Sequence, residues 1–364
     1  MKYLFHLGHP AHFHLYKNLI FDLKAKGNQT FILIKKKDIL EDLLIDAGID
    51  YHNILPSGRS SSLVAIGFGL IKQDVSIFNF CLKNRPDILI GSSTSITHVG
   101  KTLKIPSIVL GEDDAAIIPF FAKLSYPFAS TILTPDVCDN GKWNNKSIKY
   151  KGYHELAYLH PDHFTPDKKI AKKYVDLSKP YFLVRFAKLD AHHDSGISGI
   201  NDAIAQKIIK ILEPFGTVYI TSERKFRNEL EPHRLHIKPL DIHHVMAYAS
   251  IYIGDSQTMA AEAGVLGVPF IRYNDFVGKI GYLNDLENKY KLGYGIKSNN
   301  EEILFNTLKK ILQKKDRNKE WQDKRTLMLT KKINVAKFIT WFVEDYPESS
   351  IIMKHNSNYQ NRFK

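Results

Sequence analysis

Residues 251–269 read Ile251-Tyr252-Ile253-Gly254-Asp255-Ser256-Gln257-Thr258-Met259-Ala260-Ala261-Glu262-Ala263-Gly264-Val265-Leu266-Gly267-Val268-Pro269. The first residues have the apolar pattern of a short strand, and Asp255 and Ser256 form a small polar turn. The turn opens a helical segment that ends at Gly267. A strand, a turn and a helix in this order are typical of an α/β domain.

The start of this expected helix is a candidate phosphate-binding site. Backbone N–H groups at a helix N-terminus lack intrahelical partners and carry a partial positive charge, which favours an anion. Ser256 and Thr258 add hydroxyl donors, and Glu262 lies one turn after Thr258 on the same face. A carboxylate there can accept hydrogen bonds from sugar hydroxyls. Two interpretations stay open: a capped helix without a ligand, and the diphosphate–ribose site of a sugar-nucleotide protein.

The composition is that of a soluble globular protein with two domains. The chain has 364 residues, of which 44% are hydrophobic and 24% charged. Its two cysteines, Cys81 and Cys138, cannot build a disulfide framework and show no metal-ligand spacing. The N-terminal residues enter a strand without a signal-peptide pattern. The sequence therefore predicts a cytoplasmic protein.

The net charge of +13 favours an anionic partner. No zinc knuckle, RNA-binding strand motif or basic recognition helix is recognisable, so we do not expect nucleic acid as a partner. No apolar run reaches the roughly 20 residues of a membrane span. The closest, residues 62–71, is flanked by Arg59 and Lys72. It is either a buried helix or a surface that contacts lipid headgroups at the inner face of a membrane.

Strand and helix patterns alternate along the chain, which indicates βαβ units with parallel sheets. One series runs to about residue 155, and the pattern restarts at residues 181–186 after a connector rich in proline and histidine. We expect an N-terminal domain over 1–155, a second domain over 156–345 and a polar tail over 346–364. Two Rossmann-like domains that face one another across a cleft form the GT-B arrangement. Ligands of such sheets bind beyond the carboxyl ends of the strands.

Five motifs carry a resemblance to a known family. They are Gly8-His9-Pro10-Ala11-His12, Tyr150-Lys151-Gly152-Tyr153-His154-Glu155-Leu156-Ala157-Tyr158-Leu159, Arg185-Phe186 with His193-Asp194, Ile220-Thr221-Ser222-Glu223-Arg224, and Asp255-Ser256-Gln257-Thr258-Met259-Ala260-Ala261-Glu262. Over about residues 1–300 the chain resembles a microbial family of unknown function that is grouped with predicted glycosyltransferases and with the UDP-N-acetylglucosamine 2-epimerases. The resemblance implies a GT-B fold and a nucleotide-sugar ligand, with UDP as the expected nucleotide and no cofactor.

The resemblance also suggests roles for individual residues. Glu112 resembles a catalytic acid of the hydrolysing 2-epimerases. However, Ser92-Ser93-Thr94 stand where the pattern of those enzymes has an aspartate, which argues against epimerase chemistry. Residues 8–12 resemble the Gly-rich first loop, with its histidine, of the GT-B transferases that build cell-wall precursors. The residues that resemble donor-diphosphate and ribose contacts of those transferases are Ser256, Gln257, Thr258 and Glu262.

Two groups in the first domain are candidates for proton transfer. His12 lies at the start of the first expected helix, where the helix dipole favours a neutral imidazole that can act as a general base. Glu112 and Asp113, followed by Asp114, form an acidic run after an apolar strand, and like charges raise one another's pKa. The alternatives are a histidine that only caps the helix or packs in the core, and a solvated acidic loop.

Arginines end two expected strands of the second domain. Arg185 and Arg224, together with Ser222, can hold a phosphate and stabilise the charge on a departing nucleoside diphosphate. Ordinary surface ion pairing is the alternative for each arginine. His243 precedes the strand at residue 251 and is placed to line the nucleotide pocket. The adjacent histidines have no companion ligands at metal spacing, so no metal site is expected.

Together, these observations predict a glycosyltransferase that uses a nucleotide-sugar donor in the synthesis of surface polysaccharide or glycolipid. The second domain would bind the nucleotide sugar, and the first domain would bind the acceptor, a glycan or a lipid-linked glycan. A lipid-linked acceptor would explain the basic charge and the apolar stretch, through peripheral contact with an anionic membrane. The alternatives are a hydrolysing or non-hydrolysing UDP-N-acetylhexosamine 2-epimerase and a non-catalytic sugar-nucleotide-binding protein.

Overall fold

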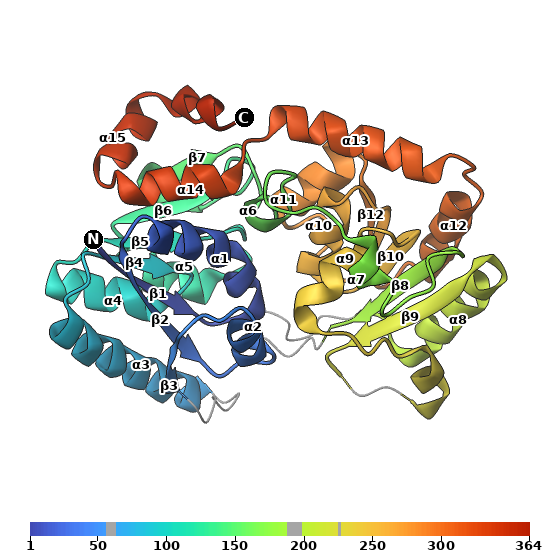
Figure 1. Ribbon diagram of the computed structural model, residues 1–364, viewed down its shortest axis with the longest axis horizontal. Helices are drawn as coiled ribbons and strands as arrows, with labels where there is room; N and C mark the ends of the chain where they lie inside the picture. The colour runs from blue at the N-terminus through green and yellow to red at the C-terminus, as the bar shows by residue number, and fades with distance from the viewer. Residues whose placement is uncertain (56–62, 188–198, 225–226) are drawn as a thin grey trace. The chain divides into compact units, whose positions relative to one another are not determined.

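The computed structural model describes residues 1–55, 63–187, 199–224 and 227–364 (Figure 1). The chain forms two compact units. The first consists of Met1–His163 and Lys332–Lys364, and the second of Phe164–Lys331. Arg59 and the pair His193-Asp194, which the sequence analysis singled out, lie outside the described residues.

The first unit is built on a parallel sheet of seven strands in the order β3-β2-β1-β4-β5-β6-β7. The strands are β1 Lys2–Leu7, β2 Gln29–Lys35, β3 His52–Leu55, β4 Ile88–Gly91, β5 Ser107–Leu110, β6 Thr131–Pro135 and β7 Ser147–Tyr150. Its helices are α1 Pro10–Ala25, α2 Leu40–Asp46, α3 Leu63–Asn84, α4 Thr94–Leu103, α5 Pro119–Ser125, η1 Gly141–Lys146, α6 Leu156–Leu159, α14 Val335–Glu344, α15 Glu348–His355 and η7 Ser357–Phe363.

The periodicity of the sequence explains how these elements pack. Along α1, the apolar residues at helical spacing are all buried, which confirms the expected first helix; they are Phe13, Tyr16, Leu19, Ile20 and Leu23. In the sheet, the central strands are apolar on both faces, as parallel strands covered by helices require. The carboxyl ends of β1, β4, β5 and β7 therefore lie at one edge of a rigid sheet.

The C-terminal segment belongs to the first unit. The apolar face of α14, with Val335, Phe338 and Phe342, is buried, and α14 packs on α1 and α6. Gln360 accepts a hydrogen bond from the backbone N–H of Lys151 at 2.6 Å. The unit boundaries thus differ from the expected 1–155, 156–345 and 346–364. Residues 332–364 return to the first sheet, and the residues expected as a polar tail form α15 and η7.

The second unit is built on a parallel sheet of five strands in the order β12-β11-β10-β8-β9. The strands are β8 Tyr181–Phe186, β9 Thr217–Ser222, β10 Ile251–Gly254, β11 Phe270–Tyr273 and β12 Gly293–Ile296. Its helices are α7 Lys168–Ala171, α8 Asp202–Leu212, η3 Glu213–Phe215, η4 Asn228–His233, η5 Pro239–Asp241, α9 Ile242–Met246, α10 Gln257–Val265, α11 Gly281–Asn284, η6 Asp285–Lys289, α12 Glu301–Leu312 and α13 Arg317–Lys331.

The stretch at residues 251–269 folds as the sequence predicts. Strand β10 leads into a turn at Asp255 and Ser256, and the turn opens α10. Gly267 follows the helix with φ of +75°, a backbone angle that favours glycine. Both units are α/β with parallel sheets and flanking helices. The predicted fold class, two Rossmann-like domains, is confirmed.

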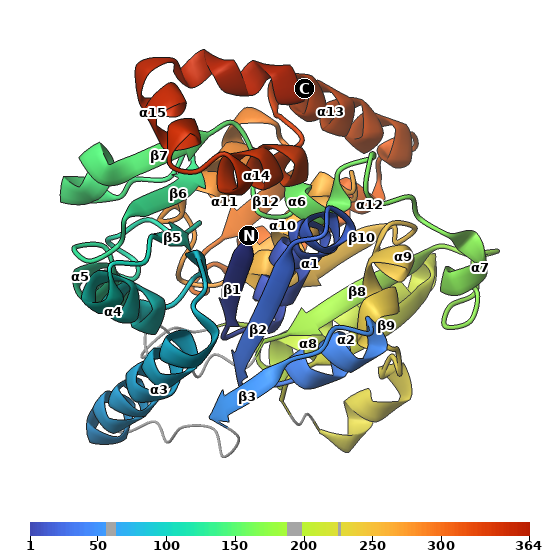
Figure 2. The same ribbon diagram turned by 60° about the vertical axis from the view of Figure 1, so that its left-hand side comes forward.

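The apolar stretch at residues 62–71 forms the start of α3 from Leu63 onward. On this helix Phe68 is 70% and Ile71 59% exposed, so the part with described side chains is not a buried helix. Helix α4 lies between α3 and α5, as Figure 2 shows. Within the described residues, no helix is long and apolar enough to cross a membrane.

Candidate functional site

In the second unit, the candidate site is centred on the turn between β10 and α10. Gly254 allows this turn, because a Cβ there would lie 3.0 Å from the Cβ of Arg185. The Ser256 Oγ accepts a hydrogen bond from the backbone N–H of Met259 at 3.4 Å, so it caps the helix. Gln257 and Thr258 are partly exposed in the first turn. The helix start therefore offers backbone N–H groups and the Thr258 hydroxyl to a ligand.

Asp255 holds this turn from inside. Its Oδ1 accepts from the backbone N–H of Ala187 at 2.6 Å, and its Oδ2 from that of Ile200 at 3.1 Å. The residue is only 2% exposed, and burial raises its pKa to about 6. Asp255 thus ties the end of β8 and the residues before α8 to the turn.

A buried ion pair supports the same turn from the neighbouring strand. Arg272 on β11 pairs with Glu287 through two hydrogen bonds, Nε–Oε1 at 2.9 Å and Nη2–Oε2 at 3.2 Å. Arg272 also contacts Asn274, whose Nδ2 donates to the carbonyl of Asp255 at 2.9 Å. The sequence analysis did not assign a role to Arg272. The sequence does contain a signal for this role, because an arginine within an apolar strand is expected to be buried and a buried arginine must have a partner.

The two arginines lie near the strand ends that the sequence predicts, Arg185 as the penultimate residue of β8 and Arg224 two residues after β9. Both already contact protein groups. Arg185 pairs with the Glu223 carboxylate. Arg224 donates to the carbonyl of Ile200, and its guanidinium lies 5.1 Å from the ring centre of Phe186. Within the described residues, the Nε atoms of both arginines make no hydrogen bond. Both Nε atoms are buried, whereas the side chains as a whole are 16% exposed for Arg185 and 33% for Arg224.

The Ser222 Oγ donates to the carbonyl of Arg224 at 2.6 Å, and it accepts from the backbone N–H of the same residue at 3.1 Å. Both bonds fix the backbone of the turn after β9. The predicted phosphate-binding role of Ser222 therefore stays a prediction.

His243 and Glu262, which the sequence named separately, are brought together. The Nε2 of His243 lies 2.9 Å from Oε1 of Glu262, and both side chains are about 5% exposed. The ring of Phe164 lies 6.1 Å from that of His243 and 4.8 Å from that of His244. The imidazole of His243 thus orients the Glu262 carboxylate.

In the first unit, His12 lies in the first turn of α1, which begins at Pro10 and is capped by His9. The Nδ1 of His12 accepts a hydrogen bond from the backbone N–H of Gly8 at 3.1 Å. Burial, reinforced by His9 and Lys35, holds the pKa of His12 well below its usual value, so the imidazole is neutral. Since Nδ1 accepts, the proton of the neutral ring is on Nε2. The predicted base role stays a prediction, and this geometry favours a donor role.

The hydroxyl groups of the two serines after β4 contact other parts of the first unit. Ser92 Oγ donates to the carbonyl of Leu110 at 2.5 Å and lies 3.3 Å from the hydroxyl of Tyr16. Ser93 Oγ lies 2.6 Å from Nδ1 of His6. Where the resemblance to 2-epimerases calls for an aspartate, this chain therefore has hydroxyls that join strands and helix α1.

Glu112, after β5, is the centre of an acidic cluster. Its Oε1 accepts from the backbone N–H of His154 at 2.6 Å, and its Oε2 lies 3.4 Å from His154 Nδ1. Burial, then the charges of Glu155 and Asp113, raise the pKa of Glu112 well above its usual value.

Asp113 therefore acts on Glu112 through its charge, whereas Asp114 accepts from the backbone N–H of Asp139 at 2.7 Å. The sequence analysis did not assign roles to His154 and Glu155. The signal was two polar residues just after the end of β7 in a parallel sheet.

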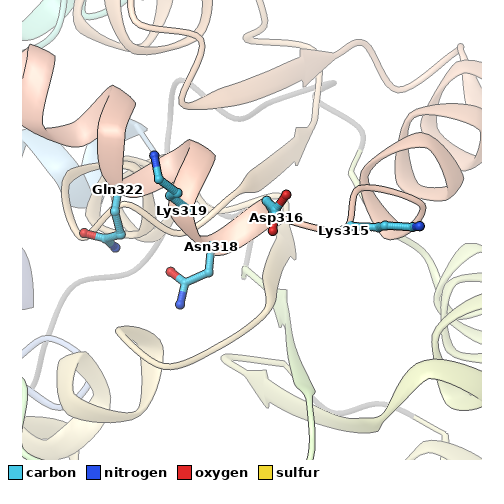
Figure 3. Close-up of a pocket in the computed structure, with 5 residues that line it drawn as sticks. All are labelled: Lys315, Asp316, Asn318, Lys319 and Gln322. Atoms are coloured by element: carbon cyan, nitrogen blue, oxygen red, sulfur yellow. The ribbon is translucent and has the colours of Figure 1, made fainter.

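Two surface hollows lie apart from these strand ends. One is formed by residues at the beginning of α13, which Figure 3 labels: Lys315, Asp316, Asn318, Lys319 and Gln322. The other, beside β12, includes Glu287 and Lys291. Neither contains a residue that the sequence predicts to bind or react. Among the described residues, no three His, Cys, Asp or Glu side chains are arranged to hold a metal ion.

Comparison with protein families shows to which family the chain belongs. Residues 2–337 match the family described as "Protein of unknown function (DUF354)". The chain belongs to the DUF354 family. No curated protein matches it.

Several solved structures share the fold of this DUF354 protein. The S. aureus MnaA–UDP structure covers 96% of this chain and 97% of its own, with TM-score 0.67 and 12% identity. The UDP-GlcNAc 2-epimerase from Methanocaldococcus jannaschii, in complex with UDP-GlcNAc and UDP, covers 90% and 100%, with TM-score 0.62 and 15% identity. The spinosyn forosaminyltransferase SpnP covers 91% and 95%, with TM-score 0.58 and 14% identity. At these identities the likeness shows the fold, which is GT-B.

Proposed function

We propose that this DUF354 protein is a GT-B glycosyltransferase that uses a nucleotide-sugar donor, with UDP as the nucleotide. The observation that carries the proposal is the turn from β10 into α10. It presents a helix N-terminus, the Thr258 hydroxyl and the buried Glu262 within one helical turn. These groups suit a diphosphate followed by a ribose. The UDP and UDP-GlcNAc named in two similar structures support this choice of ligand.

In this proposal the second unit binds the nucleotide sugar, and the first unit binds the acceptor, a glycan or a lipid-linked glycan of surface polysaccharide or glycolipid synthesis. Arg185 and Arg224, whose side chains are partly exposed, would act on the departing diphosphate through their guanidinium groups. A UDP-N-acetylhexosamine 2-epimerase is the second candidate. It is supported by the position of Glu112, but Ser92 and Ser93 supply no carboxylate after β4.

The proposed reaction is tested by incubating the protein with a panel of UDP-sugars, with and without glycan acceptors. We expect release of UDP that depends on the acceptor. Conversion of the sugar nucleotide without an acceptor would instead establish an epimerase. Binding without turnover in the presence of the whole panel would establish a non-catalytic binding protein.

Replacing Thr258 by valine is expected to weaken UDP binding by about 1–3 kcal/mol, or roughly 5- to 150-fold in Kd. Valine keeps the shape of threonine but cannot donate to a phosphate. Isothermal titration with UDP measures the change. The matched control is Thr307→Val, on α12 of the same unit, which should bind UDP as the wild type does. If both variants bind UDP as tightly as the wild type, α10 is not part of the nucleotide site.

We also propose that helices α3 and α5 contact an anionic membrane. Three apolar residues at helical spacing on α3 are exposed, namely Phe68, Ile71 and Val75. On α5, Phe120 is 74% and Leu124 45% exposed. Exposed lysines accompany them on α3, α4 and α5 and at the end of α4: Lys72, Lys83, Lys101, Lys104 and Lys123. Apolar side chains flanked by cations are typical of surfaces that bind anionic lipid headgroups.

Co-sedimentation with phosphatidylglycerol vesicles is expected to decrease as salt is added, because ions screen the lysines from the headgroups. The double variant Phe68→Ser/Phe120→Ser should bind less at every salt concentration. Ile45→Ser, which changes an exposed apolar residue on α2, is the control and should bind normally. Equal binding of all three proteins would rule out this surface.

A further inference from the structure

A histidine on α4 joins the two helices of the proposed membrane surface. Helix α4 lies between α3 and α5 (Figure 2). The Nδ1 of His98 lies 2.8 Å from Oδ2 of Asp74 on α3, and its Nε2 lies 2.9 Å from the backbone carbonyl oxygen of Leu124 on α5. Asp74 directly precedes Val75 of the exposed α3 residues, and Leu124 is itself one of the exposed α5 residues. His98 therefore links α5 to α3 at the surface that would face the lipid.

The partners of this ring require a proton on both of its nitrogens. A carboxylate and a backbone carbonyl have no proton to donate, so each accepts a hydrogen bond from the ring. A neutral imidazole has one N–H group, whereas an imidazolium has two. The hydrogen bond to Asp74 raises the pKa of His98 above its ordinary value of 6.5; burial opposes this change, and the hydrogen bond to Leu124 supports it. The geometry thus fits the charged form of His98.

The position of His98 at the end of α5 also favours a cation. Leu124 belongs to the last turn of α5, where carbonyls lack partners further along the helix and carry a partial negative charge. Just beyond the helix, the ring of Phe128 lies 5.2 Å from that of His98, at an angle of 88°. The side chains of His98 and Asp74 are 25% and 27% exposed, so a proton can pass between the ring and water.

Asp74 is the charged side chain that meets the ring. The other described charged side chains on the three helices are exposed lysines, namely Lys72, Lys83, Lys101 and Lys123. His6 on β1, whose pKa Asp74 also influences, is neutral because burial lowers that pKa to about 3. Lys146, at the end of η1, donates to two backbone carbonyls just beyond α5, at 3.0 and 2.9 Å. The link between α5 and α3 therefore titrates at His98.

We propose that the charged His98 is a pH-dependent link between α5 and α3, and that its loss of a proton weakens binding to anionic membranes. This inference rests on the membrane contact proposed above. A neutral ring keeps one N–H group, which donates to the negative carboxylate of Asp74 in preference to an uncharged carbonyl. The lone pair of Nε2 then faces the carbonyl oxygen of Leu124, and this hydrogen bond is lost.

The direction of the pH dependence follows from the protonated form. The link is present while His98 is charged, and it is lost as the pH rises through the raised pKa of His98. Because Lys146 still holds the segment beyond α5, the helix loosens without unfolding. Phe120 and Leu124 on α5 then no longer keep a fixed position beside the exposed residues of α3. Membrane affinity is therefore highest at acidic pH.

The charge of His98 is measured by NMR titration of the histidine ring protons in the protein without lipid. His98→Gln identifies the signal, because that signal is then missing. We expect a pKa above the ordinary 6.5 in the wild type. Asp74→Asn keeps the shape of the side chain but removes its charge, so it should lower this pKa. A pKa at or below the ordinary value, or one that Asp74→Asn leaves unchanged, would overturn the link.

The effect on membrane binding is measured by co-sedimentation with phosphatidylglycerol vesicles at constant salt, from pH about 5.5 to about 8.5, where ordinary lysines and the lipid phosphate stay charged. The affinity of the wild type should fall by about fivefold or more over this range, as is typical of two coupled equilibria. His98→Gln should bind weakly throughout, with most of the pH dependence lost. Asp74→Asn should shift the midpoint to lower pH. His236→Gln, an exposed histidine of the second unit, is the control and should behave as the wild type does.

Hydrogen exchange of the lipid-free protein at one acidic pH shows whether the link holds α5. Amides of α5 should exchange faster in His98→Gln than in the wild type, whereas those of α1 and α14 should be unchanged, which shows that the variant is folded. Equal exchange of α5 would overturn the link. The same pH dependence of vesicle binding in His98→Gln and the wild type would overturn the regulation. No vesicle binding by the wild type at any pH, with the expected titration and exchange, would overturn the membrane contact while leaving the link in place.

Discussion

His12→Ala is expected to lower turnover by about 10²- to 10³-fold, the usual cost of removing one hydrogen-bond donor aimed at developing charge. The structure assigns this donor to Nε2, because Nδ1 accepts from the backbone N–H of Gly8. Burial keeps the ring neutral, so it stays a donor at neutral pH without adding a positive charge. The expected loss appears in kcat, measured as UDP release in the presence of acceptor.

A glutamine at position 12 separates the donor role from the base role. The amide nitrogen of glutamine can replace the imidazole Nε2 as a donor, but an amide cannot take up a proton at neutral pH. We therefore expect His12→Gln to recover most of the turnover that His12→Ala loses. If the two variants are equally slow, His12 is the general base that its position in the sequence suggests. His52→Ala, an exposed histidine of β3, is the control.

The affinity for UDP provides a second check on the same variants. The proposed nucleotide site is formed by α10 of the second unit, whereas His12 belongs to the first. Titration of His12→Ala with UDP is thus expected to give the wild-type Kd. A weaker Kd would place His12 at the nucleotide and not at the acceptor.

Sequence patterns predicted the central parts of both sheets. The apolar residues around β1, β5, β8 and β10 form continuous runs that only a strand buried on both faces explains. The short edge strands β3 and β12 were not predicted. Residues 52–55 and 293–296 contain polar residues or glycine, and such segments resemble loops when read locally. The return of α14 to the first sheet was also missed, because its apolar face does not specify which sheet it covers.

The sequence predicted individual residues of the candidate site but not which of them contact one another. Strand ends located Glu112, Arg185 and Arg224, since parallel strands place their carboxyl ends at one edge. The partners depend on tertiary contacts between segments far apart in sequence. Glu155 lies 43 positions after Glu112 in the sequence, and Glu262 lies 19 positions after His243. A hydrophobicity pattern contains no information on which polar residues will meet.

Arg272→Met is expected to destabilise the second unit by about 3–5 kcal/mol, the usual cost of leaving one member of a buried ion pair without its partner. Arg272 is fully buried, and it makes two hydrogen bonds to Glu287 and one to Asn274. Methionine fills most of the space but leaves the Glu287 carboxylate without its counter-charge. A Cβ at Gly295 would lie 2.4 Å from Oε2 of Glu287, so the absence of a side chain at this position leaves room for the carboxylate.

The loss can be measured in the second unit alone. Of the three tryptophans, Trp321 is buried in that unit, where its Nε1 donates to the carbonyl of Leu292 at 2.7 Å. With Trp143 and Trp341 of the first unit replaced by phenylalanine, urea unfolding followed by fluorescence reports on Trp321. The measurement compares Arg272→Met with the double variant Arg272→Met/Glu287→Met in this background.

The double variant distinguishes an unpaired charge from a loss of packing. Because replacing both members of a buried pair by apolar residues of similar size is often neutral, we expect it to regain most of the lost stability. If it is as unstable as Arg272→Met, the cost is one of packing. Both variants also remove the contact to Asn274, which holds the carbonyl of Asp255 in the turn before α10. UDP binding should therefore weaken in the double variant even where stability returns, if the turn before α10 is the nucleotide site that we propose.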